Sequence, residues 1–228
     1  MISHKYKCIF IHIPKCAGTS IEFMLGHFDG HTGRDGQDHR SIRMIQPITL
    51  QAFLSIDNLK EILRATKHKY SEKILNPKNK YVVTREQYND YFKFTFVRNP
   101  WDRAFSWYKN VMRDEIHKKN YGITRQLSLT EFLYRHAGKG MLKSQLYWIK
   151  DFKGKISLDY IGRFEKLNND FQEICKHLNV SHAALPHKIR GTGDDYRKHY
   201  DNKSIDIIME YYREEIKLFN YSFDQQPK

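Results

Sequence analysis

The sequence predicts an α/β protein with a doubly wound parallel sheet flanked by helices, because short apolar runs alternate with segments of helical periodicity. Three apolar runs have the length of a strand, and each leads through a loop into a helical pattern. Strands that alternate with helices pair in parallel through right-handed crossovers. A chain of 228 residues also fits one ordinary domain. We therefore expect residues 1–228 to form a single domain.

The first strand, loop and helix are predicted for residues 6–28. Residues 6–13 are an almost unbroken apolar run, which is typical of a parallel strand covered on both faces. Residues 14–20 form a loop, and apolar side chains then recur at helical spacing up to Phe28. Residues 29–38 are rich in glycine and polar residues, so we expect a loop there.

The stretch from Arg40 to about Gln87 has the least regular pattern. Leu59, Ile62 and Leu63 indicate a helix, and residues 76–79 read Asn-Pro-Lys-Asn, which indicates a turn. We assign no chemistry to this stretch.

A second strand is predicted at residues 92–97, directly before Arg98-Asn99-Pro100. Proline suits the first turn of a helix, so a helix should begin there. Its apolar face is expected to carry Trp101, Phe105, Tyr108 and Met112.

The remainder of the chain continues the alternation. Residues 128–131 form a capping box for a helix that runs toward His136, and residues 141–149 keep helical periodicity. A third strand at residues 159–163 precedes a helix, and Asp201 caps a last helix that reaches Phe219. No internal repeat or interdomain linker is apparent.

The composition indicates an anionic partner. The chain has 39 Lys and Arg against 26 Asp and Glu, a formal charge of +13, which favours nucleotides, acidic glycans or nucleic acid. Its three cysteines are an odd number without metal-ligand spacing, which favours a reducing compartment. No apolar stretch approaches the ~20 residues of a membrane helix. We therefore expect a soluble, cytoplasmic protein without a metal site.

The loop at residues 14–20 has the composition of a phosphate-binding loop. It lies between a strand and a helix, where free backbone N–H groups and the helix dipole attract anions. Gly18 allows close approach of a phosphate, Thr19 and Ser20 add hydroxyl donors, and Lys15 adds a cation. The lysine spacing differs from that of Walker A, so the loop is only P-loop-like. The alternative is an ordinary turn with a surface lysine.

A second anion site is predicted at the end of the second strand. Arg98 stands at the sheet edge where open α/β sheets bind ligands, and Ser106 follows eight residues later. An arginine can grip a phosphate bidentately while a serine donates to it. The alternative is that Arg98 pairs with Asp102 and that Ser106 has no role in binding.

These two motifs resemble those of the sulfotransferase superfamily, specifically the carbohydrate sulfotransferases of heparan and chondroitin type and their bacterial relatives. Residues 11–20, Ile-His-Ile-Pro-Lys-Cys-Ala-Gly-Thr-Ser, are similar to the family's 5′-phosphosulfate loop. Residues 96–103, Phe-Val-Arg-Asn-Pro-Trp-Asp-Arg, with Ser106, are similar to its 3′-phosphate motif. The resemblance touches most of the chain but is poor at about residues 41–87, which we interpret as an insertion.

The resemblance implies a sulfotransferase fold and 3′-phosphoadenosine 5′-phosphosulfate as the sulfuryl donor, with 3′-phosphoadenosine 5′-phosphate as product and no metal. The acceptor it implies is a hydroxyl, of a carbohydrate in the relatives. Lys15 would stabilise the departing oxygen. The residues implied to bind the donor are Lys15, Cys16, Ala17, Gly18, Thr19, Ser20, Arg98 and Ser106, and, in a late basic loop and just after it, Arg190, Thr192 and Tyr196.

A general base is also needed, because a sugar hydroxyl is a weak nucleophile until its proton is removed. His39 stands where relatives carry an active-site histidine, so we expect it to be the base. His12 is interpreted as support for the loop. Glu165 is a candidate for orienting the base or binding the acceptor, and Gln145 for contacting the acceptor. Structural hydrogen bonding is at least an equal alternative for both.

Two other functions stay open at this point. A nucleotide-dependent phosphotransferase could use a variant phosphate loop, although no Walker lysine spacing or metal-binding acidic strand end is apparent. A nucleic-acid-binding protein would account for the charge, but the sequence has no zinc-finger or helix-turn-helix pattern. The acceptor itself is not identified, because acceptor surfaces come from variable loops.

Overall fold

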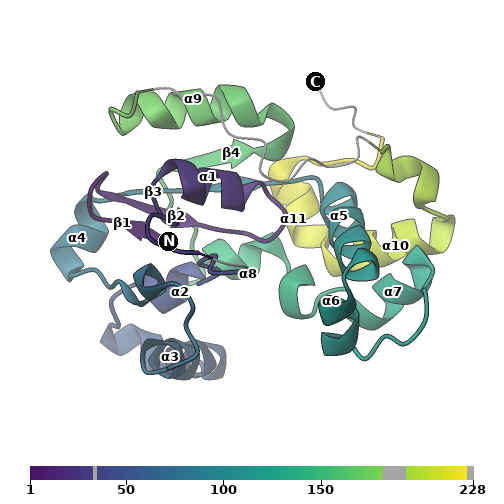
Figure 1. Ribbon diagram of the computed structural model, residues 1–228, viewed down its shortest axis with the longest axis horizontal. Helices are drawn as coiled ribbons and strands as arrows, with labels where there is room; N and C mark the ends of the chain where they lie inside the picture. Colours follow the sequence, from purple (N-terminus) through teal and green to yellow (C-terminus); the bar gives the residue numbers. More distant parts are fainter. Residues whose placement is uncertain (33–34, 182–193, 225–228) are drawn as a thin grey trace.

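The computed structural model describes residues 1–32, 35–181 and 194–224, and its centre is one four-stranded sheet in the order β1-β2-β3-β4 (Figure 1). β2 (Cys8–Ile11), β3 (Phe92–Val97) and β4 (Tyr160–Arg163) run in parallel. β1 (Ile2–Ser3) lies at the edge, antiparallel to β2. The three predicted parallel strands are therefore confirmed.

The first strand is shorter than the apolar run at residues 6–13. The chain turns between β1 and β2, and Lys7 adopts a left-handed φ of 47° at the end of this turn. The tight turn uses Tyr6 and Lys7 outside the strand, so pairing begins only at Cys8. β1 was not predicted, because two residues are too few to give a periodic pattern.

Helices cover both faces of the sheet. Figure 1 shows α1 (Gly18–Met24) and α9 (Leu167–His177) on one face, and α2 (Ile42–Ile45), α3 (Ile56–Lys69) and α8 (Gln145–Ile149) on the other. The remaining α-helices are α4 (Arg85–Asp90), α5 (Pro100–Arg113), α6 (Glu115–Asn120), α7 (Leu129–His136), α10 (Asn202–Tyr211) and α11 (Arg213–Phe219). Short 3₁₀ turns are η1 (Leu50–Leu54), η2 (Pro77–Lys80), η3 (Gly140–Leu142), η4 (Phe164–Lys166) and η5 (Tyr196–His199).

The core of the sheet is aromatic. Phe10 and Phe94 stack across β2 and β3 with ring centroids 5.0 Å apart, and both are almost fully buried. Phe96 lies against Gly162 of β4, where an added Cβ would be 2.5 Å from the ring. Glycine is therefore needed at that position for β3 and β4 to pair around a phenylalanine.

Most predicted helices are confirmed, including the capping box at Ser128 and the cap at Asp201. Two differ. The expected helix over residues 141–149 divides into η3 and α8, because the buried Arg103 side chain binds the carbonyl oxygens of Met141 and Lys143. The last helix divides into α10 and α11 at Tyr212, whose hydroxyl binds the Leu142 carbonyl.

Within the described residues, no helix is both long enough and apolar enough to cross a bilayer.

Candidate active site

The loop between β2 and α1 has an unusual backbone. Lys15 and Ala17 adopt left-handed φ values of 69° and 63°, although neither is glycine. Within the part of the chain that the structure describes, the N–H groups of Gly18 and Thr19 donate to no backbone carbonyl. Consecutive N–H groups without acceptors, in a strained turn, are typical of loops that bind anions.

Gly18 has a packing reason as well as the expected functional one. A Cβ at this position would overlap the imidazole of His12, which lies directly beneath it. His12 is 3% exposed, so the ring cannot move into solvent. His12 therefore supports the loop, and the loop tolerates only glycine above the ring.

The second predicted anion site lies next to the first. The Arg98 guanidinium donates from Nη1 to the carbonyl oxygen of Lys15 at 2.9 Å. Its Nε and Nη2 atoms donate to the two carboxylate oxygens of Asp102, each at 2.8 Å. The pairing with Asp102 that the sequence left as an alternative is thus present. It holds Arg98 against the loop at residues 14–20.

Gln145 fixes the backbone of Arg98 from inside the molecule. Its Oε1 accepts from the Arg98 N–H at 2.8 Å, and its Nε2 donates to the Arg98 carbonyl at 2.9 Å. The Sγ of Cys16 also donates to Oε1, at 3.5 Å. The Gln145 side chain is completely buried, so its geometry favours a structural role over the expected acceptor contact.

Lys15 has an altered pKa. Burial, together with the nearby guanidinium groups of Arg98 and Arg113, lowers the pKa of the Lys15 ammonium to about 8. Arg113 was not among the predicted site residues; it follows Ser106 by seven residues and so lies on the same face of α5. Three cationic side chains therefore lie near the loop at residues 14–20. Such a concentration of positive charge favours binding of a polyanionic ligand.

The other predicted donor residues lie in the loop, at the start of α1 and on α5. Thr19, Ser20 and Ser106 are half-buried, at the start of α1 and on α5. The Cys16 thiol is buried beneath the loop, and burial raises its pKa to about 12. Cys16 can therefore contribute its backbone to the loop, whereas its thiol is directed into the protein.

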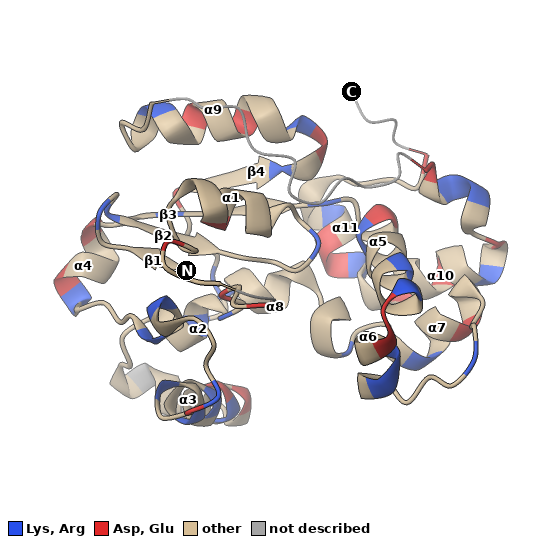
Figure 2. Ribbon diagram, in the orientation of Figure 1, with Lys and Arg blue, Asp and Glu red and all other residues tan. Residues whose placement is uncertain are grey.

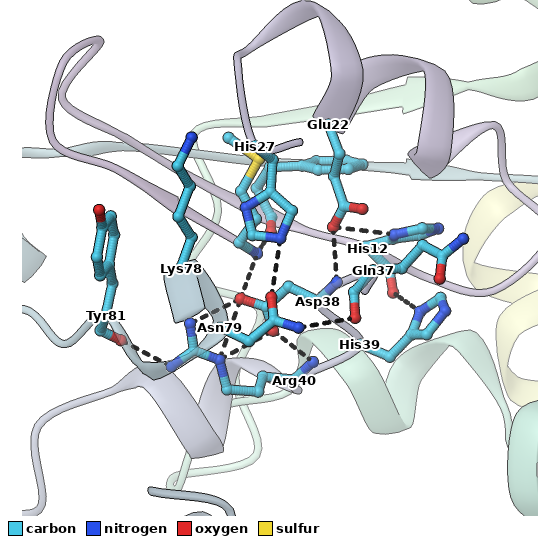
Figure 3. A network of polar contacts seen from close by, with 12 residues as sticks. His12, Glu22, His27, Gln37, Asp38, His39, Arg40, Lys78, Asn79 and Tyr81 are labelled. Atoms are coloured by element: carbon cyan, nitrogen blue, oxygen red, sulfur yellow. Dashed lines mark hydrogen bonds and ion pairs between the residues drawn. The ribbon is translucent and has the colours of Figure 1, made fainter. Parts of the chain in front are cut away.

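His39 contacts His12, whose ring lies against Gly18 of the loop, and has one ring nitrogen committed (Figure 3). Its Nδ1 is 3.2 Å from the carbonyl oxygen of His12, and the two imidazole rings are 4.2 Å apart. Because a carbonyl oxygen only accepts, Nδ1 must carry the proton, which leaves a lone pair on Nε2. Burial, followed by the adjacent His12 imidazole, lowers the pKa of His39 to about 4. The side chain is thus a neutral base at neutral pH.

A buried ion pair holds the segment that carries His39. Arg40 donates from Nη2 to Oδ2 of Asp38 at 2.6 Å, and Glu22 accepts from the Asp38 N–H at 3.0 Å (Figure 3). Burial by itself would raise the pKa of Asp38, but Arg40 and the amino group of Met1 hold it well below its usual range. The carboxylate is therefore charged and fixed immediately before His39.

The turn at residues 76–79 supports the same segment. Asn79 accepts from Nε2 of His27 at 2.8 Å and donates to the carbonyl oxygen of Gly36 at 3.1 Å. Asn76 donates to the carbonyl oxygen of His27 at 2.9 Å. The turn was predicted, but its role was missed, because the partners lie about 40 to 50 residues away in sequence.

Two further candidates use their polar groups internally. The Glu165 carboxylate accepts from the N–H of Asn99 at 2.6 Å and from the Tyr221 hydroxyl at 3.2 Å, so its contacts are structural. Tyr196, expected to contact the donor, is buried and donates to the Phe223 carbonyl at 2.6 Å. Arg190 and Thr192 lie outside the described residues.

Within the described ranges, no group of three or more His, Cys, Asp or Glu side chains is arranged to hold a metal ion. The charges around the loop come from Lys15, Arg98 and Arg113. Combined with a neutral imidazole, they could bind an anionic group and remove a proton from a nearby hydroxyl.

Comparison with known proteins decides the family. The sequence model described as "Sulfotransferase family" matches residues 1–222. This chain belongs to the sulfotransferase family. Membership supports sulfuryl transfer as the reaction class of this sulfotransferase.

Individual relatives are distant. A chain from Archaeoglobus fulgidus, described as "Uncharacterized protein", is 27% identical to this sulfotransferase over 117 residues, which cover 51% of this chain and 91% of the relative. A solved sulfotransferase from Alicyclobacillus acidocaldarius is 17% identical, with coverage of 92% of this chain and 97% of that one and a TM-score of 0.38.

Proposed function

We propose that this sulfotransferase transfers a sulfuryl group from 3′-phosphoadenosine 5′-phosphosulfate to a carbohydrate hydroxyl. The observation that carries the proposal is the contact between Arg98 and the carbonyl oxygen of Lys15, 2.9 Å long. It joins two loops that are 83 residues apart in sequence and that each have the composition of an anion site. A donor with phosphate groups at both ends of its ribose fits such an arrangement.

In this proposal, each loop binds one end of the donor. The 5′ end lies against the free N–H groups of Gly18 and Thr19, with the Lys15 ammonium beside the oxygen that leaves sulfur. Arg98 and Ser106 bind the 3′-phosphate. Arg98 keeps Asp102 as a partner while it does so, because a guanidinium has five N–H donors.

The reaction is a direct displacement. The acceptor oxygen forms a bond to sulfur, the bond between sulfur and the 5′-phosphate oxygen breaks, and that oxygen keeps the electron pair. The acceptor proton moves to Nε2 of His39, the nitrogen that the His12 carbonyl leaves free. Lys15 neutralises the charge that develops on the 5′-phosphate oxygen, and the fixed positions of Lys15 and Arg98 orient the donor.

A polar pocket of about 370 Å³ on the α2, α3 and α8 side supports a carbohydrate acceptor. Tyr147 lines it, with the Lys143 ammonium 3.8 Å and the Arg43 guanidinium 5.4 Å from the ring centroid. An aromatic ring beside charged and polar hydrogen-bonding side chains, such as Arg43, Asp57 and Asn58, suits a sugar. α8 also carries Gln145, which holds Arg98, so the pocket and the donor loop share one helix.

The test is transfer of labelled sulfate from the donor to a panel of glycans, lipids and small alcohols. We expect a labelled carbohydrate product, and we expect His39→Asn to lower kcat by about 10²–10⁴-fold without weakening binding of 3′-phosphoadenosine 5′-phosphate. Label in lipids or small alcohols alone would overturn the carbohydrate assignment. Magnesium-dependent ATP turnover without sulfate transfer would instead favour a phosphotransferase.

A further inference from the structure

The helix α3 is oriented with its apolar side outward. Its buried residues are Asn58 and Glu61, whereas Ile56 and Leu63 are 73% and 69% exposed. A helix on the surface of a protein normally buries its apolar stripe and exposes its polar one. The reversal therefore requires an explanation.

Hydrogen bonds hold the inner side of α3. Asn58 donates to the carbonyl oxygen of Phe152 at 2.9 Å. Glu61 accepts from the hydroxyl groups of Ser41 at 2.9 Å and Tyr147 at 2.7 Å. Because these polar contacts fix the rotation of the helix, its aliphatic side chains have no route into the core.

The exposed side chains form one surface, which we call the α3 apolar face. Ile56, Leu59 and Leu63 follow helical spacing along α3, and η1, which contacts α3, adds the exposed Leu50 and Phe53. Leu50 is 89% exposed and Phe53 is 53% exposed. Contiguous exposed apolar side chains of this kind mark an interaction surface.

Basic side chains accompany the α3 apolar face. Lys60 and Lys67 follow Ile56 by four and eleven residues and so lie on the same side of the helix. Residues 56–73 contain five Lys and Arg against three Asp and Glu, and one of these acids, Glu61, is buried. Figure 2 shows basic and acidic positions along α3, at the lower end of the molecule in this view.

We propose that the α3 apolar face docks on the surface of a membrane that contains anionic lipids. Aliphatic side chains next to lysines fit the boundary between acyl chains and anionic head groups. A second copy of this chain fits less well, because two such faces would bring lysines together in a protein with a charge of +13. A bilayer also accepts protruding side chains such as Leu50 without a matching groove.

The experiment is cosedimentation of the full chain with vesicles of phosphatidylcholine, with and without about one anionic phosphatidylglycerol in three lipids. We expect binding to the anionic vesicles that weakens as salt rises. Ile56→Ser with Leu63→Ser should reduce the partition coefficient by about tenfold or more, since each removes an inserted side chain. The matched control is Met209→Ser with Leu218→Ser, which removes side chains that are 52% and 53% exposed on α10 and α11.

The apolar variant separates docking from simple charge attraction. Binding that persists unchanged in the Ile56→Ser, Leu63→Ser variant would mean that charge alone attracts the protein, and would overturn the proposal. Absence of binding to anionic vesicles would do the same. A dimer in light scattering that this variant dissociates would assign the face to a second copy instead. Circular dichroism of each variant verifies that the fold is intact.

Discussion

At the level of the single residue, Arg98 is held in place by its neighbours and is also the proposed ligand of the 3′-phosphate. Its guanidinium donates to the Lys15 carbonyl and pairs with Asp102. The guanidinium carbon also stacks over the Phe164 ring, 3.8 Å from the ring centroid. Packing and pairing together hold the side chain in one orientation, and only 13% of it is exposed. A preorganised arginine loses little conformational entropy when it binds a phosphate.

Lys15 gives a prediction about protons. Its pKa of about 8 means that about half of the free protein has a neutral Lys15 at about pH 8, and about a tenth at about pH 7. A bound phosphate favours the charged ammonium and raises this pKa. Binding of 3′-phosphoadenosine 5′-phosphate should therefore take up about half a proton at pH 8 and much less at pH 7.

Calorimetry in buffers of different ionisation enthalpy measures this uptake. Lys15→Arg is the control, because arginine keeps the charge but does not titrate in this range. In Lys15→Arg, proton uptake should disappear while the nucleotide still binds. Proton release at pH 8, or equal uptake in Lys15→Arg, would contradict the position assigned to Lys15.

At the level of elements, η2 acts as a clamp on the segment that carries His39. Asn79 Nδ2 also donates to the carbonyl oxygen of Gln37 at 3.3 Å, so one side chain holds three groups of the 27–37 loop. Asn79→Ala leaves these buried groups without partners and should lower the free energy of unfolding by about 1–3 kcal/mol. The looser loop should also lower kcat while donor binding stays unchanged.

Urea unfolding and steady-state kinetics measure these two effects. Asn168→Ala, an exposed position on α9, is the control and should change neither quantity. An Asn79→Ala variant with normal kcat, or one with weakened donor binding, would show that η2 does not position the base.

Elements with strong local patterns could be predicted from sequence. β3 and α5 lie where the apolar run and Pro100 predicted them. The pattern is readable because the buried residues of each element are close together in the sequence. The break between η3 and α8 could not be predicted, since it depends on the side chain of Arg103, some 40 residues away. The site residues divide in the same way, into those with a local motif and those that depend on contacts distant in sequence.

The two phosphate-type loops were visible as local motifs, whereas the supports for the base were not. Asn79 and Glu22 act through contacts that join distant segments, and no local spacing indicates them. Tyr196 was expected at the donor site because it stands near a basic loop in sequence. Its burial beside Phe223 depends on the chain returning from α11, which sequence proximity does not reveal.

At the level of the whole molecule, the buried histidines couple stability to pH. Burial, then nearby positive charge, lowers the pKa of His12 to about 3, whereas in the unfolded chain it is about 6.5. Between these values the unfolded state binds more protons, so the contribution of His12 to stability falls as the pH falls. Glu22 acts in the opposite direction, because burial raises its pKa.

The difference between wild type and His12→Asn measures the contribution of His12 together with that of its 3.1 Å contact with the Glu22 carboxylate. In urea unfolding from pH 7 to pH 4.5, the wild-type stability should rise more steeply with pH than that of the variant, by at most about 1.4 kcal/mol per pH unit. Equal slopes, or a steeper slope in the variant, would contradict a neutral buried His12.

The central claim is that the loops at Lys15 and Arg98 bind opposite ends of one doubly phosphorylated nucleotide. Arg125→Ala is the control for Arg98→Ala, because Arg125 forms an exposed pair with Glu131. The most direct test is calorimetry with 3′-phosphoadenosine 5′-phosphate and adenosine 5′-phosphate. We predict that the 3′-phosphate strengthens binding by about 10- to 100-fold in the wild type and in Arg125→Ala but not in Arg98→Ala. Equal affinity of the wild type for the two nucleotides would contradict the claim.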